Sequence, residues 1–116
     1  MRIIIVGAGT VGKQLAGRLC EEGHDIIVID HNHNKLRLLE EYYDLQTITG
    51  DGTSINVLET ANIAKSDLVI SVTNSDASNV LIGKLASQMQ PKTKNRVARI
   101  RSSQCFLDPT ILTPND

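Results

Sequence analysis

The chain has little aromatic content, with one Phe, two Tyr and no Trp among 116 residues. Stacking of bases on aromatic rings is therefore not expected to be its way of binding. Its 12 basic and 13 acidic side chains nearly cancel. Because no charge excess attracts nucleic acid or an anionic membrane surface, we expect no nucleic-acid partner.

Long apolar runs are also missing. The run from Ile3 to Val6 is too short for a secretory signal, and none in the chain approaches the roughly 20 residues that cross a bilayer. Two cysteines, Cys20 and Cys105, are too few for a disulfide framework or a metal site built from cysteines. We interpret both as free thiols of a cytoplasmic protein.

What the chain does have is a regular alternation of short apolar runs with longer amphipathic stretches. This alternation predicts βαβ units around a parallel sheet. With 41% apolar and 22% charged residues, the chain can bury the core of one ordinary domain. We therefore predict an α/β fold, a Rossmann-like doubly wound parallel sheet in three α/β/α layers.

The strands are expected at residues 2–6, 25–30, 45–49, 68–72 and 96–100. The helices are expected to begin near residues 10, 32, 53 and 76. Polar residues in the third and fifth strands are typical of sheet edges, so we predict the strand order 3-2-1-4-5. We expect Ile55 and Leu58 on the buried face of the third helix, and Leu81, Leu85 and Met89 on that of the fourth.

Residues 7–12 read Gly-Ala-Gly-Thr-Val-Gly, directly after the first apolar strand and at the start of a helix. In this pattern Gly7 permits a tight turn, Gly9 lets a pyrophosphate approach the backbone, and Gly12 lets the helix pack closely on the strand. The N–H groups and positive dipole end of the helix then face the phosphates. The predicted phosphate-binding residues are Gly7, Ala8, Gly9, Thr10, Val11 and Gly12.

Asp30 ends the second predicted strand, about 20 residues beyond the glycine turn, where a carboxylate can accept both ribose hydroxyls of an adenosine. Its charge would repel a 2′-phosphate, and none of the next three residues, 31–33, is an Arg, so NAD or NADH is favoured over NADP. The alternative is that Asp30 only caps the following helix. We interpret His31 as a solvated residue beside the ribose, because its spacing from His33 is poor for a zinc site.

Ligands of doubly wound sheets bind outside the carboxyl ends of the strands, so the later loops supply further candidates. After the third strand, Asp51 and Gly52 suit a tight turn near the adenine. The same stretch could equally be a helix entry with Thr53 as its N-cap.

After the fourth strand, Thr73 and Asn74 could contact the central or distal part of the ligand. They could equally belong to the N-cap of the fourth helix. Arg101 follows the fifth strand and is a weaker candidate for a phosphate contact.

No proton donor or substrate-binding segment accompanies these candidates, although a dehydrogenase needs both. A methyltransferase usually carries an acidic residue in its first strand motif, where this chain has the apolar residues 3–6. Two functions remain: a non-catalytic nucleotide-sensing lobe, and the cofactor-binding domain of an NAD-dependent oxidoreductase.

Five stretches give the sequence a family resemblance: residues 7–12, 24–30, 50–52, 72–76 and 96–101. Over about residues 1–103 the chain resembles the TrkA-N (RCK) family of nucleotide-binding lobes. The resemblance implies a non-catalytic lobe that binds NAD or NADH, or in some members ATP or ADP. It also implies control of a membrane potassium transporter or channel from the cytoplasmic face of the plasma membrane, by a homo-oligomer that is a dimer or a larger ring.

The resemblance carries roles to individual residues. It implies that Gly7, Gly9 and Gly12 line the phosphates and that Asp30 takes the ribose. The residues that it places at the border of the ligand are Asp51, Thr73, Asn74 and Arg101. Thr10 stands where some ATP-responsive relatives have an Arg, which lowers the expectation of a strong triphosphate contact. Residues 104–116 are expected to be a tail or the truncated start of the family's next elements.

Overall fold

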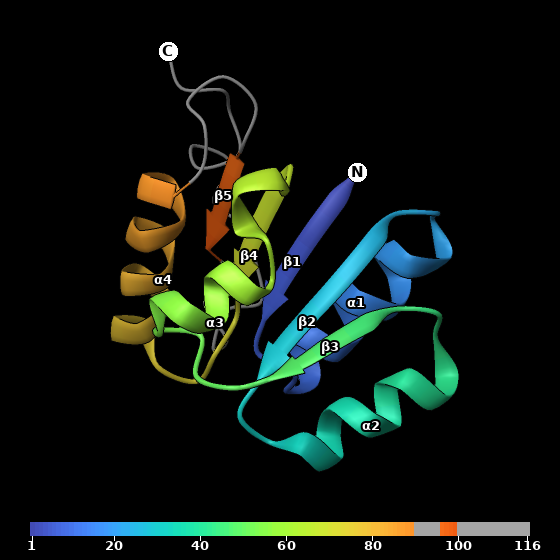
Figure 1. The fold of residues 1–116 in the computed structure, drawn as a ribbon. Coiled ribbons are helices and arrows are strands. Elements are labelled where there is room, and N and C mark those ends of the chain that lie inside the picture. The colour runs from blue at the N-terminus through green and yellow to red at the C-terminus, as the bar shows by residue number, and fades with distance from the viewer. Residues whose placement is uncertain (90–95, 100–116) are drawn as a thin grey trace.

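A computed structural model of the chain describes residues 1–89 and 96–99, the last four as a strand (Figure 1). The elements are, in order, β1 (Arg2–Val6), α1 (Thr10–Glu21), β2 (Asp25–Asp30), α2 (His33–Tyr42), β3 (Gln46–Thr49), α3 (Ile55–Thr60), the 3-10 helix η1 (Ile63–Lys65), β4 (Leu68–Ser71), α4 (Asp76–Met89) and β5 (Arg96–Arg99). Strands and helices alternate as predicted, with β3 and β4 each one residue shorter.

The five strands form one parallel sheet in the order β3-β2-β1-β4-β5. In the centre, Ile5 of β1 lies opposite Val28 of β2 on one side and Ile70 of β4 on the other. This order confirms the predicted fold class. Because the winding reverses at β1, the connections after β1 and β4 leave the sheet toward opposite faces, and a crevice opens between them.

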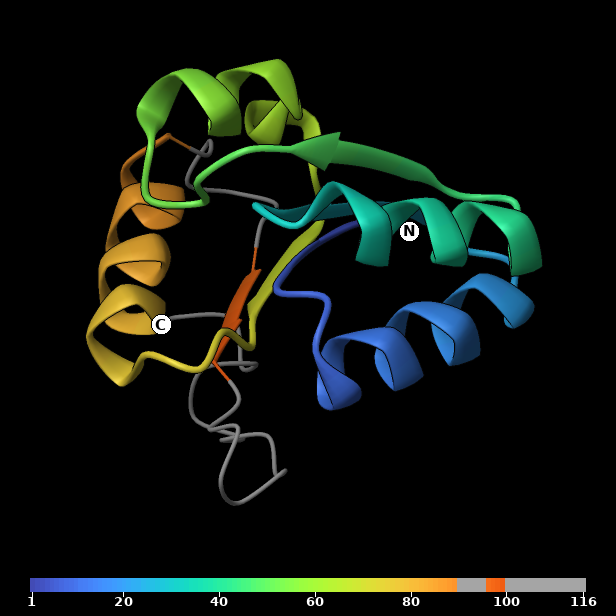
Figure 2. The same ribbon diagram turned by 90° about the horizontal axis from the view of Figure 1, so that it is seen from below.

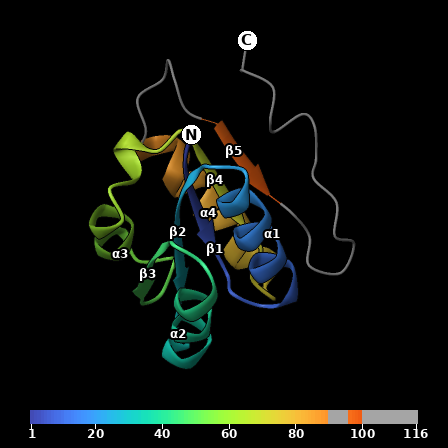
Figure 3. The same cartoon turned by 90° about the vertical axis from the view of Figure 1, so that its right-hand side faces the viewer.

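Each face of the sheet has its own buried cluster, because successive strand residues alternate between the faces. On one face, Ile3 packs with Ala16 of α1 and Leu36 of α2. Figures 2 and 3 show α1 and α2 on this side of the sheet and α3 and α4 on the other. The second cluster consists of Ile4, Val6, Ile27, Ile29, Leu58, Ala61, Ile63, Val69, Ile82 and Ala86. The described helices include none that is long and apolar enough to cross a membrane.

The buried face of α4 differs from the predicted one at Leu81, whereas Leu85 and Met89 pack against the second cluster as predicted. Leu81 is 46% exposed, whereas Ile82 and Ala86 are buried. Steps of four residues drift by about 40° each on a helix with 3.6 residues per turn, so a constant four-residue spacing leaves the face. Ile55 was also predicted to be buried and is exposed, because it opens a short helix that reaches the core through Leu58.

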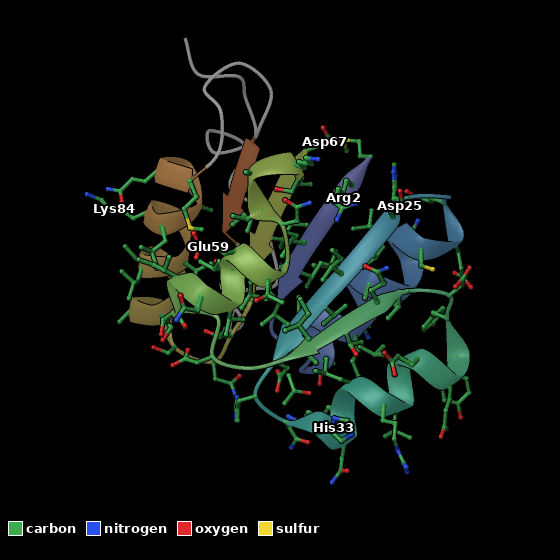
Figure 4. The ribbon with its side chains drawn as sticks, in the orientation of Figure 1. Arg2, Asp25, His33, Glu59, Asp67 and Lys84 are labelled. Atoms are coloured by element: carbon green, nitrogen blue, oxygen red, sulfur yellow. The ribbon has the colours of Figure 1, made fainter. Side chains whose placement is uncertain are left out.

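The two ends of the sheet are built differently. At the amino ends, the backbone N–H of Arg2 donates to Asp67 Oδ2 at 2.9 Å, and the N–H of Asp67 donates to the Arg2 carbonyl at 2.7 Å. Figure 4 shows Arg2, Asp25 and Asp67 at this end and His33 at the opposite end. The loops that follow the strands therefore gather at the end that carries His33.

We expect Leu58→Ala to lower the free energy of unfolding by about 2–5 kcal/mol, because it empties a fully buried position of the second cluster. Leu38→Ala removes the same atoms from a side chain that is 51% exposed. Its effect should stay within about 0.5 kcal/mol. Urea unfolding measures both variants, and equal losses would contradict the packing of α3 on the sheet.

Candidate functional site

A cleft of about 400 Å³ lies at the carboxyl ends of β1, β2, β3 and β4. Among the predicted site residues, those that line it are Gly7, Ala8, Gly9, Asp30, His31, Asp51, Gly52, Thr73 and Asn74. Thr10, Val11 and Gly12 lie in the first turn of α1, next to this lining. Arg101 lies outside the described residues. The structure thus brings four separate loops together at one cleft.

The three glycines of the first turn have different environments. Gly7 has a φ of +114°, which disfavours other residues, and an added Cβ would lie 2.8 Å from the Val72 carbonyl oxygen. A Cβ on Gly12 would overlap the carbonyl oxygen of Gly7. A Cβ on Gly9 would meet no atom within 4 Å. Gly7 and Gly12 are therefore required by the fold, whereas Gly9 keeps an open approach to the backbone.

The N-terminus of α1 has no side-chain cap. Gly9 stands at its N-cap position, and the first turn contains no acidic residue. By contrast, Asn32 caps α2 by accepting from the N–H groups of Asn34 and Lys35 at 3.0 and 3.2 Å. The first N–H groups of an α-helix have no partner within the helix. The open cap of α1 therefore suits an anion.

Asp30 connects the glycine turn to the start of α2. Its Oδ2 accepts from the N–H of Ala8 and its Oδ1 from the N–H of Asn32, both at 2.7 Å. The side chain is 9% exposed, and the exposed His31 ring lies 3.7 Å from Oδ1. Asn32, and not Asp30, is the cap of α2. Because each carboxylate oxygen has a second lone pair, Asp30 can still accept from ribose hydroxyls.

The loop after β3 is a tight turn that also borders the cleft. Asp51 Oδ1 accepts from the backbone N–H of Thr53 at 2.9 Å and from its hydroxyl at 2.8 Å. These two hydrogen bonds, the backbone one first, lower the pKa of the Asp51 carboxyl below its ordinary value. A Cβ on Gly52 would overlap the side chain of Val6. Ser54, rather than Thr53, occupies the N-cap position of α3.

The loop after β4 is held by a residue that the sequence analysis missed. Asn79 of α4 is 3% exposed. Its Oδ1 accepts from the Thr73 N–H at 2.9 Å and from the Thr73 hydroxyl at 2.7 Å, and its Nδ2 donates to the Thr73 carbonyl at 3.1 Å. Ser75 caps α4 through a bond from the N–H of Ser78 at 3.1 Å. The sequence signal for Asn79 is its spacing of three and seven residues from Ile82 and Ala86, which puts a polar residue on the buried face of α4.

Lys35 lines the cleft and is a second residue that the sequence analysis missed. It lies in the first turn of α2 and is exposed, so it adds a cation beside the acidic Asp30 and Asp51. Within the described part of the chain, no three His, Cys, Asp or Glu side chains are arranged to hold a metal ion.

The comparison with known families decides which group of Rossmann domains this cleft belongs to. Residues 3–105 match the model of the TrkA-N domain. The chain belongs to the TrkA-N domain family. This confirms the resemblance on which the residue roles were transferred.

Curated relatives of this TrkA-N domain carry the same family name. It is 41% identical over 112 residues to the Trk system potassium uptake protein TrkA of Vibrio alginolyticus, covering 97% of this chain and 24% of that protein. It is 37% identical over 116 residues to the protein of the same name from Haemophilus influenzae, covering 100% of this chain and 25% of that protein. The chain therefore spans about a quarter of the length of these relatives.

Solved structures share the fold. The TrkA-N domain of the inner membrane protein ybaL from Escherichia coli superposes with a TM-score of 0.78 at 17% identity, over 86% of this chain and 72% of that one. The GsuK channel bound to NAD superposes with a TM-score of 0.73 at 20% identity, over 86% of this chain and 18% of that one. The Bordetella bronchiseptica enzyme WbmG in complex with NAD superposes with a TM-score of 0.67 at 26% identity, over 86% of this chain and 37% of that one. The fold thus occurs in both a channel and an enzyme.

We expect Gly9→Ala to change the stability of the TrkA-N domain by less than about 1 kcal/mol, because its Cβ meets no atom and its φ is −74°, whereas Ala is a weaker N-cap than Gly. Gly12→Ala should destabilise the domain by more than about 1 kcal/mol, because its Cβ would overlap Gly7. Thermal unfolding of the two variants without ligand is the measurement. A loss of stability in Gly9→Ala as large as that in Gly12→Ala would contradict the open position of Gly9.

Proposed function

We propose that this TrkA-N domain binds NAD or NADH in the cleft and acts as a non-catalytic regulatory lobe that controls a membrane potassium transporter or channel. The observation that carries the proposal is the side-chain-free cap of α1 at Gly9, beside the carboxylate of Asp30. An anion site and a hydroxyl acceptor lie at adjacent strand ends. That combination matches a nucleotide, with ATP or ADP as the alternative ligand.

The cleft residues fit the chemistry of this ligand. The pyrophosphate would lie at the N-terminus of α1 over Gly9, where a Cβ would find open space. The adenosine ribose would donate hydrogen bonds to Asp30. Asp51 and Gly52 would border the adenine, and Thr73 and Asn74 the distal part. Because the Thr73 hydroxyl already donates to Asn79 of α4, we expect that loop to contribute shape more than hydrogen-bond donors.

The preference for NAD over NADP rests on the balance of charge near Asp30. Its carboxylate is largely buried and held by two backbone N–H groups, so it cannot turn away from a 2′-phosphate at little cost. Lys35 opposes this repulsion, but it is an exposed, flexible cation. We therefore expect Asp30 to dominate and NAD to be preferred.

The hydrogen bonds of the two acidic lining residues, Asp30 and Asp51, favour a regulatory role over catalysis. Asp51 accepts two hydrogen bonds from Thr53, which lower the pKa of its carboxyl and favour the ionised form over a transferable proton. Asp30 accepts from two backbone N–H groups, so both of its oxygens already have partners. The curated relatives are named as potassium uptake proteins. The oxidoreductase alternative is supported by the likeness to the NAD-bound enzyme WbmG.

Control of a transporter also requires an assembly with two states, because a ligand that binds both states equally shifts nothing. We propose that the full-length protein is a homo-oligomer, a dimer or a larger ring, at the cytoplasmic face of the plasma membrane. Its partner there would be the potassium transporter or channel. We propose residues 1–103 as the nucleotide-binding part and 104–116, which lie outside the described residues, as the lead into the next elements.

We expect NAD or NADH to stabilise the domain by about 2.7 kcal/mol when the free ligand is at 100 times its dissociation constant. Calorimetry with NAD, NADH, NADP, NADPH, ATP and ADP gives the affinities, and thermal unfolding gives the stabilisation. NAD should bind more tightly than NADP, and Asp30→Ala should narrow that difference.

Gly9→Ala is the variant designed to block binding without disturbing the fold. Its methyl group would enter the space that we propose for the pyrophosphate, and it touches no protein atom. The variant should fold normally and lose the ligand-induced shift. The assignment of the cleft is wrong if none of the nucleotides binds the unaltered domain, and the role of Asp30 is wrong if NAD and NADP bind equally.

In a full-length TrkA-type protein that carries this domain, we expect Gly9→Ala to abolish the response of potassium flux to nucleotides. The reason is that the variant loses differential binding while the fold remains intact. The measurement is flux in liposomes that contain the transporter and its regulator, with and without NAD, NADH, ATP or ADP. Steady oxidation of NADH with a small substrate, together with a flux that ignores every nucleotide, would instead support the oxidoreductase alternative.

A further inference from the structure

We propose that Asn79 is a positioning residue for the phosphate-binding half of the cleft. It would act through Thr73 and Gly7 and never touch the ligand. The inference rests on the proposed nucleotide binding and adds to it a role for a residue of α4. Its basis is the close contact between the glycine turn, which has no side-chain bulk there, and the loop after β4.

Asn79 forms a closed set of hydrogen bonds with the residue that follows Val72. Its amide both accepts from the N–H and the hydroxyl of Thr73 and donates to the Thr73 carbonyl. Its own backbone carbonyl accepts from the hydroxyl of Ser71 at 3.2 Å. The plane of the peptide between residues 72 and 73 is thereby fixed from the side of α4.

The glycine turn packs directly against this same peptide. A Cβ on Gly7 would lie 2.8 Å from the Val72 carbonyl oxygen and 3.1 Å from the Thr73 nitrogen. The Thr73 nitrogen is the atom whose hydrogen Asn79 accepts. A Cβ on Gly12 would in turn lie 3.3 Å from the Val72 side chain. A rotation of this peptide would therefore displace the turn that leads into the N-terminus of α1.

The buried position of Asn79 also calls for an explanation, since its neighbours on the same face of α4 are Ile82, Gly83 and Ala86. A buried amide costs free energy unless it is hydrogen-bonded, and here every bond goes to the loop that lines the cleft. The adenosine half has contacts away from α4 as well, because Asp51 binds Thr53 and Asp30 binds Asn32 in addition to Ala8 of the glycine turn. Loss of Asn79 should accordingly affect the phosphates more than the adenosine.

The test compares ligands with and without a diphosphate. We expect Asn79→Ala to weaken binding of NAD and ADP by about tenfold, the size of one lost hydrogen bond to a buried group, and to change adenosine binding far less. Leu85→Ala is the matched control, because Leu85 lies on the same helix, packs on the second cluster and is not a lining residue. It should lower stability and leave the ratio of NAD to adenosine affinity unchanged.

A second variant covers the case in which Asn79→Ala does not fold. Asn79→Asp keeps the size of the side chain, and in its protonated form the introduced carboxylic acid can both accept from Thr73 N–H and donate to Thr73 carbonyl oxygen. In its ionised form it would repel that carbonyl. Its NAD affinity relative to the unaltered domain should therefore fall as the pH rises through the titration of the new acid, while the ratio for adenosine stays level.

The outcomes separate the two proposals. If the unaltered domain binds neither NAD nor ADP, the nucleotide site itself is wrong and the role of Asn79 falls with it. If the unaltered domain binds NAD but Asn79→Ala weakens NAD and adenosine by the same factor, or weakens neither, Asn79 is a structural residue only. A level pH profile for Asn79→Asp overturns the inference in the same way.

Discussion

The close approach of two backbone segments at the carboxyl ends of β1 and β4 is the constraint on which the rest of the cleft depends. Gly7 and Gly12 have no room for a Cβ there, because Val72 and Thr73 occupy the space at Gly7, and Gly7 itself occupies the space at Gly12. The sheet holds this contact in place, since the N–H of Val72 donates to the Val6 carbonyl at 2.8 Å and that of Gly7 to the Ile29 carbonyl at 2.8 Å. The helix that follows the turn thus begins at the edge of the cleft.

Two largely buried polar side chains, Asp30 and Asn79, hold the loops in place beyond the ends of the strands, where the backbone hydrogen bonds of the sheet stop. Asp30 binds the N–H groups of Ala8 and Asn32, and Asn79 binds the backbone of Thr73. Buried backbone groups outside helices and strands need such partners. One residue therefore fixes the wall between β1 and β2, and the other fixes the wall at β4.

The sequence predicted the strand order and the loops that line the cleft, because apolar runs and glycine spacing are local signals that survive folding. It did not predict Asn79 or Lys35, since their roles depend on which loop lies opposite them in space. It also placed Leu81 in the core, where the structure has it exposed. A spacing of four residues stays on one face of a helix for about two turns, and it then leaves that face because a helix has 3.6 residues per turn. For Asp30, the sequence offered a ribose ligand or a helix cap, and the structure shows a brace between two loops. That third role needed the distance between segments that lie far apart in the chain.

The N-terminus of α1, which has no side-chain cap, is also suited to small anions of the buffer. Within the described part of the chain, Asn32 accepts from two N–H groups in the first turn of α2 and Ser75 from one in that of α4. Ser54 of α3, like Gly9 of α1, makes no side-chain cap bond. The first turn of α1 lies at the cleft, where its uncapped N–H groups suit a small oxyanion. Phosphate or sulfate buffers would therefore compete with a nucleotide for the same N–H groups, and an affinity measured in them would be a competition constant. The ligand-free state of such a domain is defined only together with the salt in which it is dissolved.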